Sequence, residues 1–242
     1  MKRTFKHILL SSSIGLASIS VLSLPSTTTA APAINIQSVL QQERAWAGMQ
    51  TKRVKVGDIE WAYSEGGTKG KPVIMLIHGL AGSRDNWNRV ARYLTPHYQV
   101  IIPDLPGQGD SKAPNDFDYS IPNLTEKLRR FAEAIQVEKD LHIAGHSMGG
   151  AISLLYAAQY PIDAKSLFLV NSAGVFKSAN TPYLKDPNLL RNFVVAKPGD
   201  FDRLFKIAAQ LPPFIPNELK VEQEKLMISN ATNTSKLIEQ LI

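Results

Sequence analysis

Short apolar runs of strand length recur along this chain and alternate with amphipathic stretches, and this rhythm constrains the fold more than any other feature. The runs span residues 72–79, 98–107, 140–147 and 164–174. Each of the first three is followed by a stretch with helical periodicity, at 84–94, 123–135 and 148–159. Such alternation predicts an α/β protein, in which a mostly parallel sheet carries helices on both faces.

The segments on either side of this alternating region differ from it. Before it, we expect a helix at 36–49 and two strands at 52–56 and 59–63. After it there is no further buried-strand run, and amphipathic stretches follow at 187–195, 200–211, 217–229 and 233–242. We therefore predict a core at 34–174 and a helical cap, or lid, at 175–242.

Residues 1–33 have the pattern of an export signal. Three basic residues precede a 17-residue apolar run at 8–24, and small residues follow it. Cleavage is expected near Ala30 to Ala33, which predicts a periplasmic or extracellular protein. An uncleaved membrane anchor is the alternative, but six serines make the run a poor span of a hydrocarbon layer about 30 Å thick.

Composition and spacing argue against several classes of function. The chain has no cysteine, which excludes disulfides, thiolate zinc sites and thiol catalysis. His142 and His146 lack a third metal ligand nearby, and no phosphate-binding glycine loop is present, so we expect no metal and no cofactor. The net charge is +6, but three basic residues belong to 1–33 and the others form no dense run. Nucleic acid is therefore not expected as a partner.

The third apolar run ends in Gly145-His146-Ser147-Met148-Gly149, where a strand meets a helix. A nucleophilic serine at such a junction is lifted out of the sheet on a tight turn. Gly145 and Gly149 suit that turn because a Cβ at either position would collide with a neighbouring strand or helix. The start of the helix directs unpaired N–H groups at the same point, which favours an anion beside Ser147. This pattern predicts acyl transfer with Ser147 as the nucleophile.

His78-Gly79-Leu80 ends an earlier apolar run, where a loop can direct a backbone N–H into the same pocket. We assign the oxyanion hole to the N–H groups of Leu80 and Met148. The loop at 104–111 is expected to shape the pocket, with no group placed for proton transfer. The supporting motif residues are His78, Gly79, Gly145, His146 and Gly149.

Three motifs together resemble the α/β-hydrolase superfamily in order and spacing: GHSMGG around Ser147, IHGLAGS at 77–83 and DLPGQGDS at 104–111. Within it, the chain resembles bacterial lipases, esterases and carbon–carbon bond hydrolases with a helical cap. The resemblance is close over about 54–174, whereas the cap matches only in kind. It implies hydrolysis of small-molecule or lipid carboxylic esters through an acyl-enzyme on Ser147. Branches that use an aspartate nucleophile are excluded by this serine.

In this superfamily the triad acid and histidine follow the nucleophile along the chain. The histidines here are His7, His78, His97, His142 and His146, so none follows Ser147. The acids downstream lack the expected position at a strand end after the cap; they are Asp163, Asp186, Asp200 and Asp202. We expect the front part of a longer hydrolase, whose last core strands, acid and histidine lie beyond Ile242. As given, it is expected to show little or no turnover; a naturally short protein is the alternative.

Other functions stay open. They are a carbon–carbon bond hydrolase of the same fold, a catalytically dead hydrolase-like binding protein and a cell-surface interaction protein that uses the cap. Apolar side chains in the cap are compatible with transient contact with a lipid surface. The acyl length and the oligomeric state are not specified by the sequence.

Overall fold

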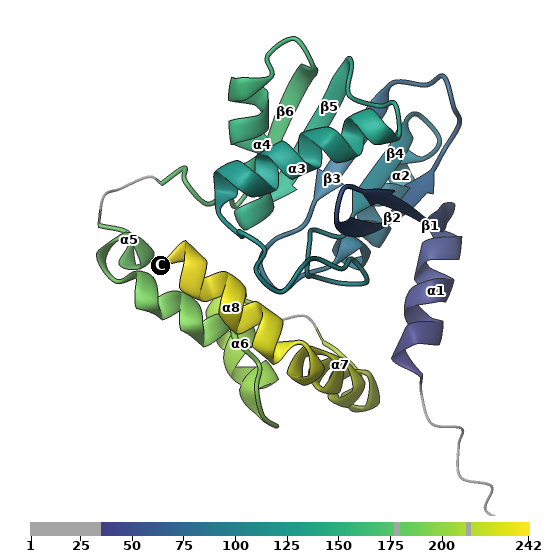
Figure 1. Ribbon diagram of the computed structural model, residues 1–242. Coiled ribbons are helices and arrows are strands. Elements are labelled where there is room, and N and C mark those ends of the chain that lie inside the picture. Colours follow the sequence, from purple (N-terminus) through teal and green to yellow (C-terminus); the bar gives the residue numbers. More distant parts are fainter. Residues whose placement is uncertain (1–34, 177–179, 212–213) are drawn as a thin grey trace, which may run out of the picture. The chain divides into compact units, whose positions relative to one another are not determined.

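A computed structural model describes residues 35–176, 180–211 and 214–242 (Figure 1). The predicted export signal at 1–33 lies outside the described residues. Within these described ranges, no helix is both long enough and apolar enough to cross a membrane.

The centre of the fold is a sheet with the strand order β1-β2-β4-β3-β5-β6. Its first three members in that order, β1, β2 and β4, are antiparallel neighbours, whereas β4, β3, β5 and β6 are mutually parallel. The bounds are β1 Met49–Val56, β2 Ile59–Gly66, β3 Val73–Ile77, β4 Gln99–Pro103, β5 Leu141–His146 and β6 Ala164–Val170. The mostly parallel sheet and the α/β class predicted from the sequence are confirmed.

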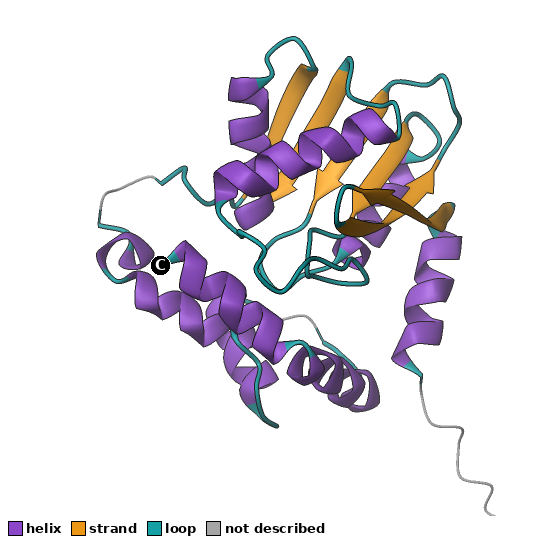
Figure 2. Ribbon diagram, in the orientation of Figure 1, coloured by secondary structure: helices purple, strands orange, loops and turns teal. Residues whose placement is uncertain are grey.

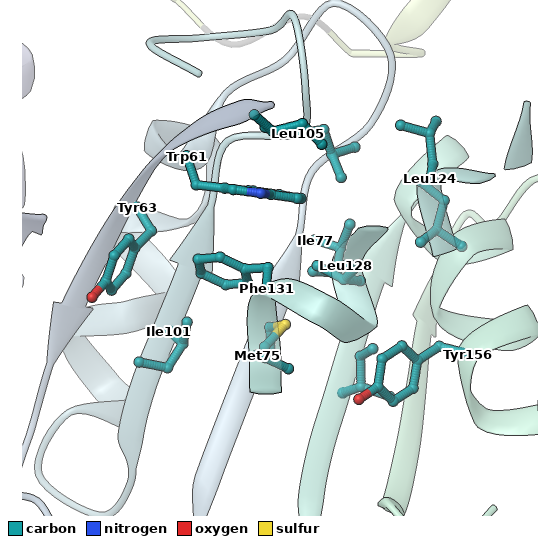
Figure 3. Close-up of a cluster of buried hydrophobic side chains, with 14 of the residues drawn as sticks. Trp61, Tyr63, Met75, Ile77, Ile101, Leu105, Leu124, Leu128, Phe131 and Tyr156 are labelled. Atoms are coloured by element: carbon teal, nitrogen blue, oxygen red, sulfur yellow. The ribbon is translucent and has the colours of Figure 1, made fainter. Parts of the chain in front are cut away.

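Alternate strand residues supply two separate hydrophobic clusters, as the two-residue repeat of a strand requires. Met75, Ile101 and Ile143 belong to one cluster, whereas Leu76 and Ile102 belong to the other. The first cluster packs under α3 (Ile121–Ala134) and α4 (Met148–Gln159), where Phe131 stacks on Trp61 with ring centroids 4.7 Å apart (Figure 3). The second packs under the 3-10 helix η1 (Arg84–Trp87) and α2 (Asn88–Leu94). Helices therefore cover both faces of the sheet (Figure 2).

Several predicted helices differ from the structure in their bounds or type; for example, the helix expected at 200–211 ends at Ala208. The first helix, α1, spans Ile36–Trp46 rather than 36–49, because Gly48 adopts φ 71° and the chain enters β1 at Met49. The segment expected as an amphipathic helix at 187–195 is a shorter 3-10 helix, η2 (Pro187–Phe193). Its i to i+3 bonds from Leu189 N–H and Val194 N–H fit a short segment between a proline and extended backbone.

The segment after β6 is helical, with α5 (Pro182–Lys185), η2, α6 (Asp200–Ala208), α7 (Asn217–Ser229) and α8 (Ala231–Leu241). Helix α8 joins it to the core. Leu237 is 1% exposed and belongs to the cluster beneath α3. The amide of Gln240 accepts from Tyr119 N–H and donates to the carbonyl of Phe117. These contacts attach α8 to the loop that precedes α3.

The edge of the sheet at β6 carries apolar surface. Among the described residues, β6 pairs with β5 alone. Phe168 in this strand is 66% exposed, and Ile162 just before it is 95% exposed. An aromatic ring exposed beside an unpaired strand edge is a surface prone to association.

Candidate active site

Ser147 occupies the tight turn between β5 and α4. Its backbone has φ 53° and ψ −121°, a region that costs about 1–3 kcal/mol for a residue with a side chain. Ser147 N–H donates to the carbonyl of Val170, and its own carbonyl accepts from the N–H groups of Gly150 and Ala173. Within the described ranges, the hydroxyl has no hydrogen-bond partner. The main chain therefore holds the turn and leaves the Ser147 hydroxyl available.

The two glycines of the turn lie where a side chain has no room. A Cβ added to Gly145 would lie 2.1 Å from the carbonyl oxygen of Gly149. A Cβ added to Gly149 would lie 2.4 Å from the carbonyl oxygen of His78 and 2.5 Å from that of Ile77. These contacts are closer than a real Cβ tolerates, so the sharp bend after β5 depends on glycine at both positions.

The loop after β3 packs directly against Ser147. A Cβ added to Gly79 would lie 3.0 Å from the Cβ of Ser147 and 3.1 Å from Nδ1 of His146. The motif that contains His78 and the motif that contains Ser147 thus meet at the carboxyl ends of the neighbouring strands β3 and β5. His78 and Ser147 are 69 positions apart in the chain. The N–H groups of Leu80 and Met148 have no acceptor anywhere in the part of the chain that the structure describes. Leu80 follows Gly79, which packs on Ser147, and Met148 follows Ser147 itself, so the two unpaired donors belong to residues next to this contact.

His78 is fully buried and fixes the first of these donors. Nε2 of His78 accepts from Leu105 N–H at 2.9 Å, which leaves the proton on Nδ1 to be donated to the carbonyl oxygen of Gly79 at 2.8 Å. Burial lowers the pKa of His78 and outweighs the opposing effect of Asp104, which keeps the ring neutral. Because a trans peptide is planar, the Gly79 carbonyl and the Leu80 N–H point in opposite directions. His78 thus orients the Leu80 N–H.

A buried ion pair lies behind the same loop. The carboxylate of Asp104, at the end of β4, is fully buried and accepts from the backbone N–H and the guanidinium of Arg84. The same guanidinium donates to Asp110 at 2.6 Å. Burial opposes the charge of Arg84, but the two carboxylates outweigh it and raise its pKa. The pair therefore anchors the Arg84 end of the stretch that follows Gly79 to the end of β4.

The importance of Arg84, Asp104 and Gln108 was not predicted from the sequence. The loop at 104–111 was expected only to shape the pocket. In the structure, Gln108 Oε1 accepts from Ala81 N–H at 3.0 Å and so reaches the loop that carries Leu80. Asp104 at the end of β4 and its buried partner Arg84, 20 positions earlier, leave no trace in the hydrophobic periodicity of the sequence. Only the proximity of Arg84 to the glycine-containing motif could have indicated it.

None of the described histidines hydrogen bonds to the Ser147 hydroxyl. Nδ1 of His142, near the start of β5, lies 2.7 Å from Oγ of Ser166 in the neighbouring strand β6. His146 is exposed overall, yet burial of part of its ring lowers its pKa. Of the downstream acids, Asp163 binds Arg129 at 2.5 Å, and Asp200 accepts from backbone N–H groups of its own segment. These two acids are therefore engaged in local structural contacts. Among the described residues, no base is hydrogen bonded to the Ser147 hydroxyl.

No group of three or more potential metal-ligating side chains occurs in residues 35–176, 180–211 and 214–242. A polar cavity of about 550 Å³ lies between the loop at 107–112 and the junction of α7 and α8. Its lining includes Arg53, Lys112 and Asn233, but neither Ser147 nor the two unpaired N–H donors. The cavity therefore borders the back of the 104–111 loop rather than the Ser147 turn.

Comparisons with known proteins agree with this architecture. The family described as the alpha/beta hydrolase fold matches residues 72–216. Lipase 1 of Psychrobacter immobilis is 34% identical over 91% of this chain and 71% of its own length. A crystal structure described as a putative lipase from Acinetobacter baumannii superposes with a TM-score of 0.84 and 62% identity, over 86% of this chain and 70% of that one. The crystal structure of a membrane phospholipase A, described as a bacterial virulence factor, superposes with a TM-score of 0.80 and 38% identity. The match covers 85% of this chain and 66% of that one. These relatives support a hydrolase, and the chain belongs to the α/β-hydrolase fold family.

Proposed function

We propose that this protein is a serine hydrolase that cleaves carboxylic esters through an acyl-enzyme on Ser147. The observation that carries the proposal is the juxtaposition at the turn. The strained Ser147 presents a free hydroxyl, and the unpaired N–H groups of Leu80 and Met148 belong to residues next to the contact between Gly79 and Ser147. Donors that are fixed before the reaction stabilise a developing oxyanion most effectively.

In the proposed reaction, Ser147 Oγ attacks the ester carbonyl carbon and loses its proton to a base. The carbonyl oxygen gains negative charge and accepts hydrogen bonds from Leu80 N–H and Met148 N–H. The alcohol then leaves with a proton, and a water molecule releases the acid from the acyl-serine by the same steps. Without a base a serine hydroxyl is a weak nucleophile, so turnover depends on a base that the described residues do not supply.

We further propose a lipid or other acyl ester as the substrate and the segment at 175–242 as a cap over the site. Lipases and a phospholipase among the relatives support this substrate class. Residues 1–33 are proposed to be an export signal, which would place the enzyme in the periplasm or outside the cell. Transient contact with a lipid surface follows from such a substrate.

The proposal is tested on the protein expressed from its complete natural gene, because turnover needs a base that the described residues do not supply. This protein is labelled with a fluorophosphonate, which reacts with activated serines, and is assayed with p-nitrophenyl esters of short and long acids. Ser147→Ala is expected to abolish both labelling and hydrolysis. The control is Ser172→Ala, since Ser172 is a half-buried serine close to the same turn. Equal labelling of the wild type and Ser147→Ala would refute Ser147 as the nucleophile.

One observation favours a second candidate, a catalytically dead binding protein of the same fold. No described histidine is paired with the Ser147 hydroxyl, although the two N–H donors are in place. Such a protein would bind fatty acids or acyl esters without turnover, and Ser147→Ala would leave the affinity unchanged. Calorimetric titration with a medium-chain fatty acid, run beside the ester assay, separates this candidate from the enzyme.

A further inference from the structure

The orientation of the Leu80 N–H depends on two peptide planes, because Leu80 lies between them. The first joins Gly79 to Leu80, and its carbonyl accepts from His78 Nδ1–H and from Gly82 N–H. The second joins Leu80 to Ala81, and its N–H donates to Gln108 Oε1 at 3.0 Å. We propose that Gln108 is a positioning residue for the oxyanion-hole N–H of Leu80, an inference that rests on the proposed function.

The second plane has no other anchor at its N–H. Gln108 Oε1 is the one acceptor for Ala81 N–H in the part of the chain that the structure describes. Ala81 itself adopts φ 56°, a conformation that is unfavourable for a residue with a Cβ. Without this hydrogen bond, the Leu80–Ala81 peptide can rotate toward a more favourable conformation. That rotation changes ψ of Leu80 and φ of Ala81. It reaches the Leu80 N–H, which lies in the Gly79–Leu80 plane, by displacing the Leu80 Cα that the two planes share.

The hydrogen bond from Ala81 N–H to the Gln108 amide leaves the amide nitrogen of Gln108 unpaired. Ala81 offers a donor, so the oxygen of the Gln108 amide must face it and the nitrogen must face away. Gln108 is 8% exposed, and its Nε2 is buried without a partner among the described groups. A buried donor left unpaired costs about 1–3 kcal/mol, and such groups are rare unless a function requires them. The retained cost indicates that holding Ala81 is the role of this side chain.

The backbone that carries Gln108 is itself rigid. Gln108 N–H donates to the carbonyl of Leu105, and Asp110 N–H donates to the buried Asp104 carboxylate at 2.8 Å. A Cβ added to Gly109 would lie 2.3 Å from that carboxylate, so the turn closes tightly onto Asp104. The loop at 104–111 is therefore rigid, and from it the side chain of Gln108 reaches the loop that carries Leu80.

Three variants of the protein expressed from its complete natural gene test this role. Gln108→Met keeps the length of the side chain but removes the acceptor, whereas Gln108→Glu keeps an acceptor at the same reach. Asn86→Leu is the matched control, since Asn86 Oδ1 accepts from Ser83 N–H at 2.7 Å at the far end of the same loop. Gln108→Met is expected to lower kcat roughly tenfold to hundredfold with KM nearly unchanged, because a misplaced oxyanion donor affects the transition state alone. Gln108→Glu should recover most of kcat, and Asn86→Leu should match the wild type.

Amide hydrogen exchange followed by NMR gives a second measurement that does not require turnover. The Ala81 N–H should be protected in the wild type and in Gln108→Glu, and should exchange faster in Gln108→Met at an unchanged melting temperature. Equal protection of Ala81 in the wild type and Gln108→Met would overturn the proposal, as would a loss of kcat that Gln108→Glu does not recover. If the wild type shows Ala81 protection that depends on Gln108 but Ser147 is not labelled by the fluorophosphonate, the ester-hydrolase function fails while the loop anchor stands.

Discussion

The imidazole Nδ1 of His78 lies 2.8 Å from the carbonyl oxygen of Gly79, whose peptide plane also carries the N–H of Leu80. Nδ1–H can donate to Gly79 in either charge state, whereas Nε2 can accept from Leu105 N–H only while the ring is neutral. A second proton would break the bond to Leu105 and place a charge in a fully buried position. Protonation of one side chain is thereby linked to the geometry beside Ser147.

This linkage predicts how stability depends on pH. Burial holds the pKa of His78 below its ordinary value of 6.5, so below that pH the unfolded chain binds a proton that the folded chain resists. The free energy of unfolding should therefore be constant above about pH 7 and fall as the pH drops from 6.5 toward 5. One such group contributes a slope of at most about 1.4 kcal/mol per pH unit.

Urea unfolding at several pH values measures this dependence. His78→Gln should be less stable than the wild type at pH 8 and should lose less additional stability between pH 6.5 and 5. His146→Gln is the control for the other histidine whose pKa is lowered by burial. An unchanged slope in His78→Gln would show that His78 is not the group responsible.

The buried pair of Arg84 and Asp104 predicts a large and asymmetric effect on stability. Asp104→Leu removes the acceptor for the Arg84 guanidinium and for the backbone N–H groups of Arg84 and Asp110. Breaking a buried pair by removing one partner costs about 3–5 kcal/mol. Chemical denaturation should show this loss.

The surface pair of Glu126 and Arg130 on α3 provides the comparison. Glu126→Gln removes a pair in which both side chains are solvent-exposed to a third or more. Such a pair contributes about 0.3–0.5 kcal/mol, so this variant should be close to the wild type. A similar loss in Asp104→Leu and Glu126→Gln would contradict the structural role of Asp104.

The sequence was sufficient to predict the sheet because each parallel strand contains a run of mainly apolar residues. Residues 72–79, for example, contain β3, whose interior residues Met75 to Ile77 are buried completely or nearly so. Helix types and ends were less predictable. Gly48 and Pro187 act through local backbone geometry, which hydrophobic periodicity does not report.

The turn at Ser147 could be located from the sequence because its residues are adjacent in the chain and its glycines have a steric reason. The groups that orient Leu80 could not, since they depend on long-range contacts. Gln108 is 27 positions from Ala81, and Asp104 is 20 positions from Arg84. Each contact joins the loops after two neighbouring strands, β3 and β4, and so becomes visible only once the strand order is known.

The close approach of Gly79 to Ser147 predicts the effect of a single methyl group. In Gly79→Ala, the new Cβ would lie 3.0 Å from the Cβ of Ser147 and 3.2 Å from the carbonyl oxygen of His146. The loop after β3 must then move by a few tenths of an ångström away from the serine. Labelling of Ser147 by a fluorophosphonate should slow roughly tenfold or more, since catalytic geometry is sensitive to small displacements. A labelling rate equal to that of the wild type would show that the loop can absorb the methyl group.

The strained backbone of Ser147 predicts that stability and function are opposed at this residue. In Ser147→Gly the absent Cβ removes the cost of φ 53°, whereas Ser147→Ala keeps the Cβ and the strain. Relief of about 1–3 kcal/mol is partly offset by about 0.5–1 kcal/mol of extra chain entropy in the unfolded glycine variant. Ser147→Gly should therefore be more stable than Ser147→Ala by up to about 2 kcal/mol in urea unfolding, and neither should be labelled. Greater stability of Ser147→Ala would mean that the turn is not strained, and that the serine is held there by its packing alone.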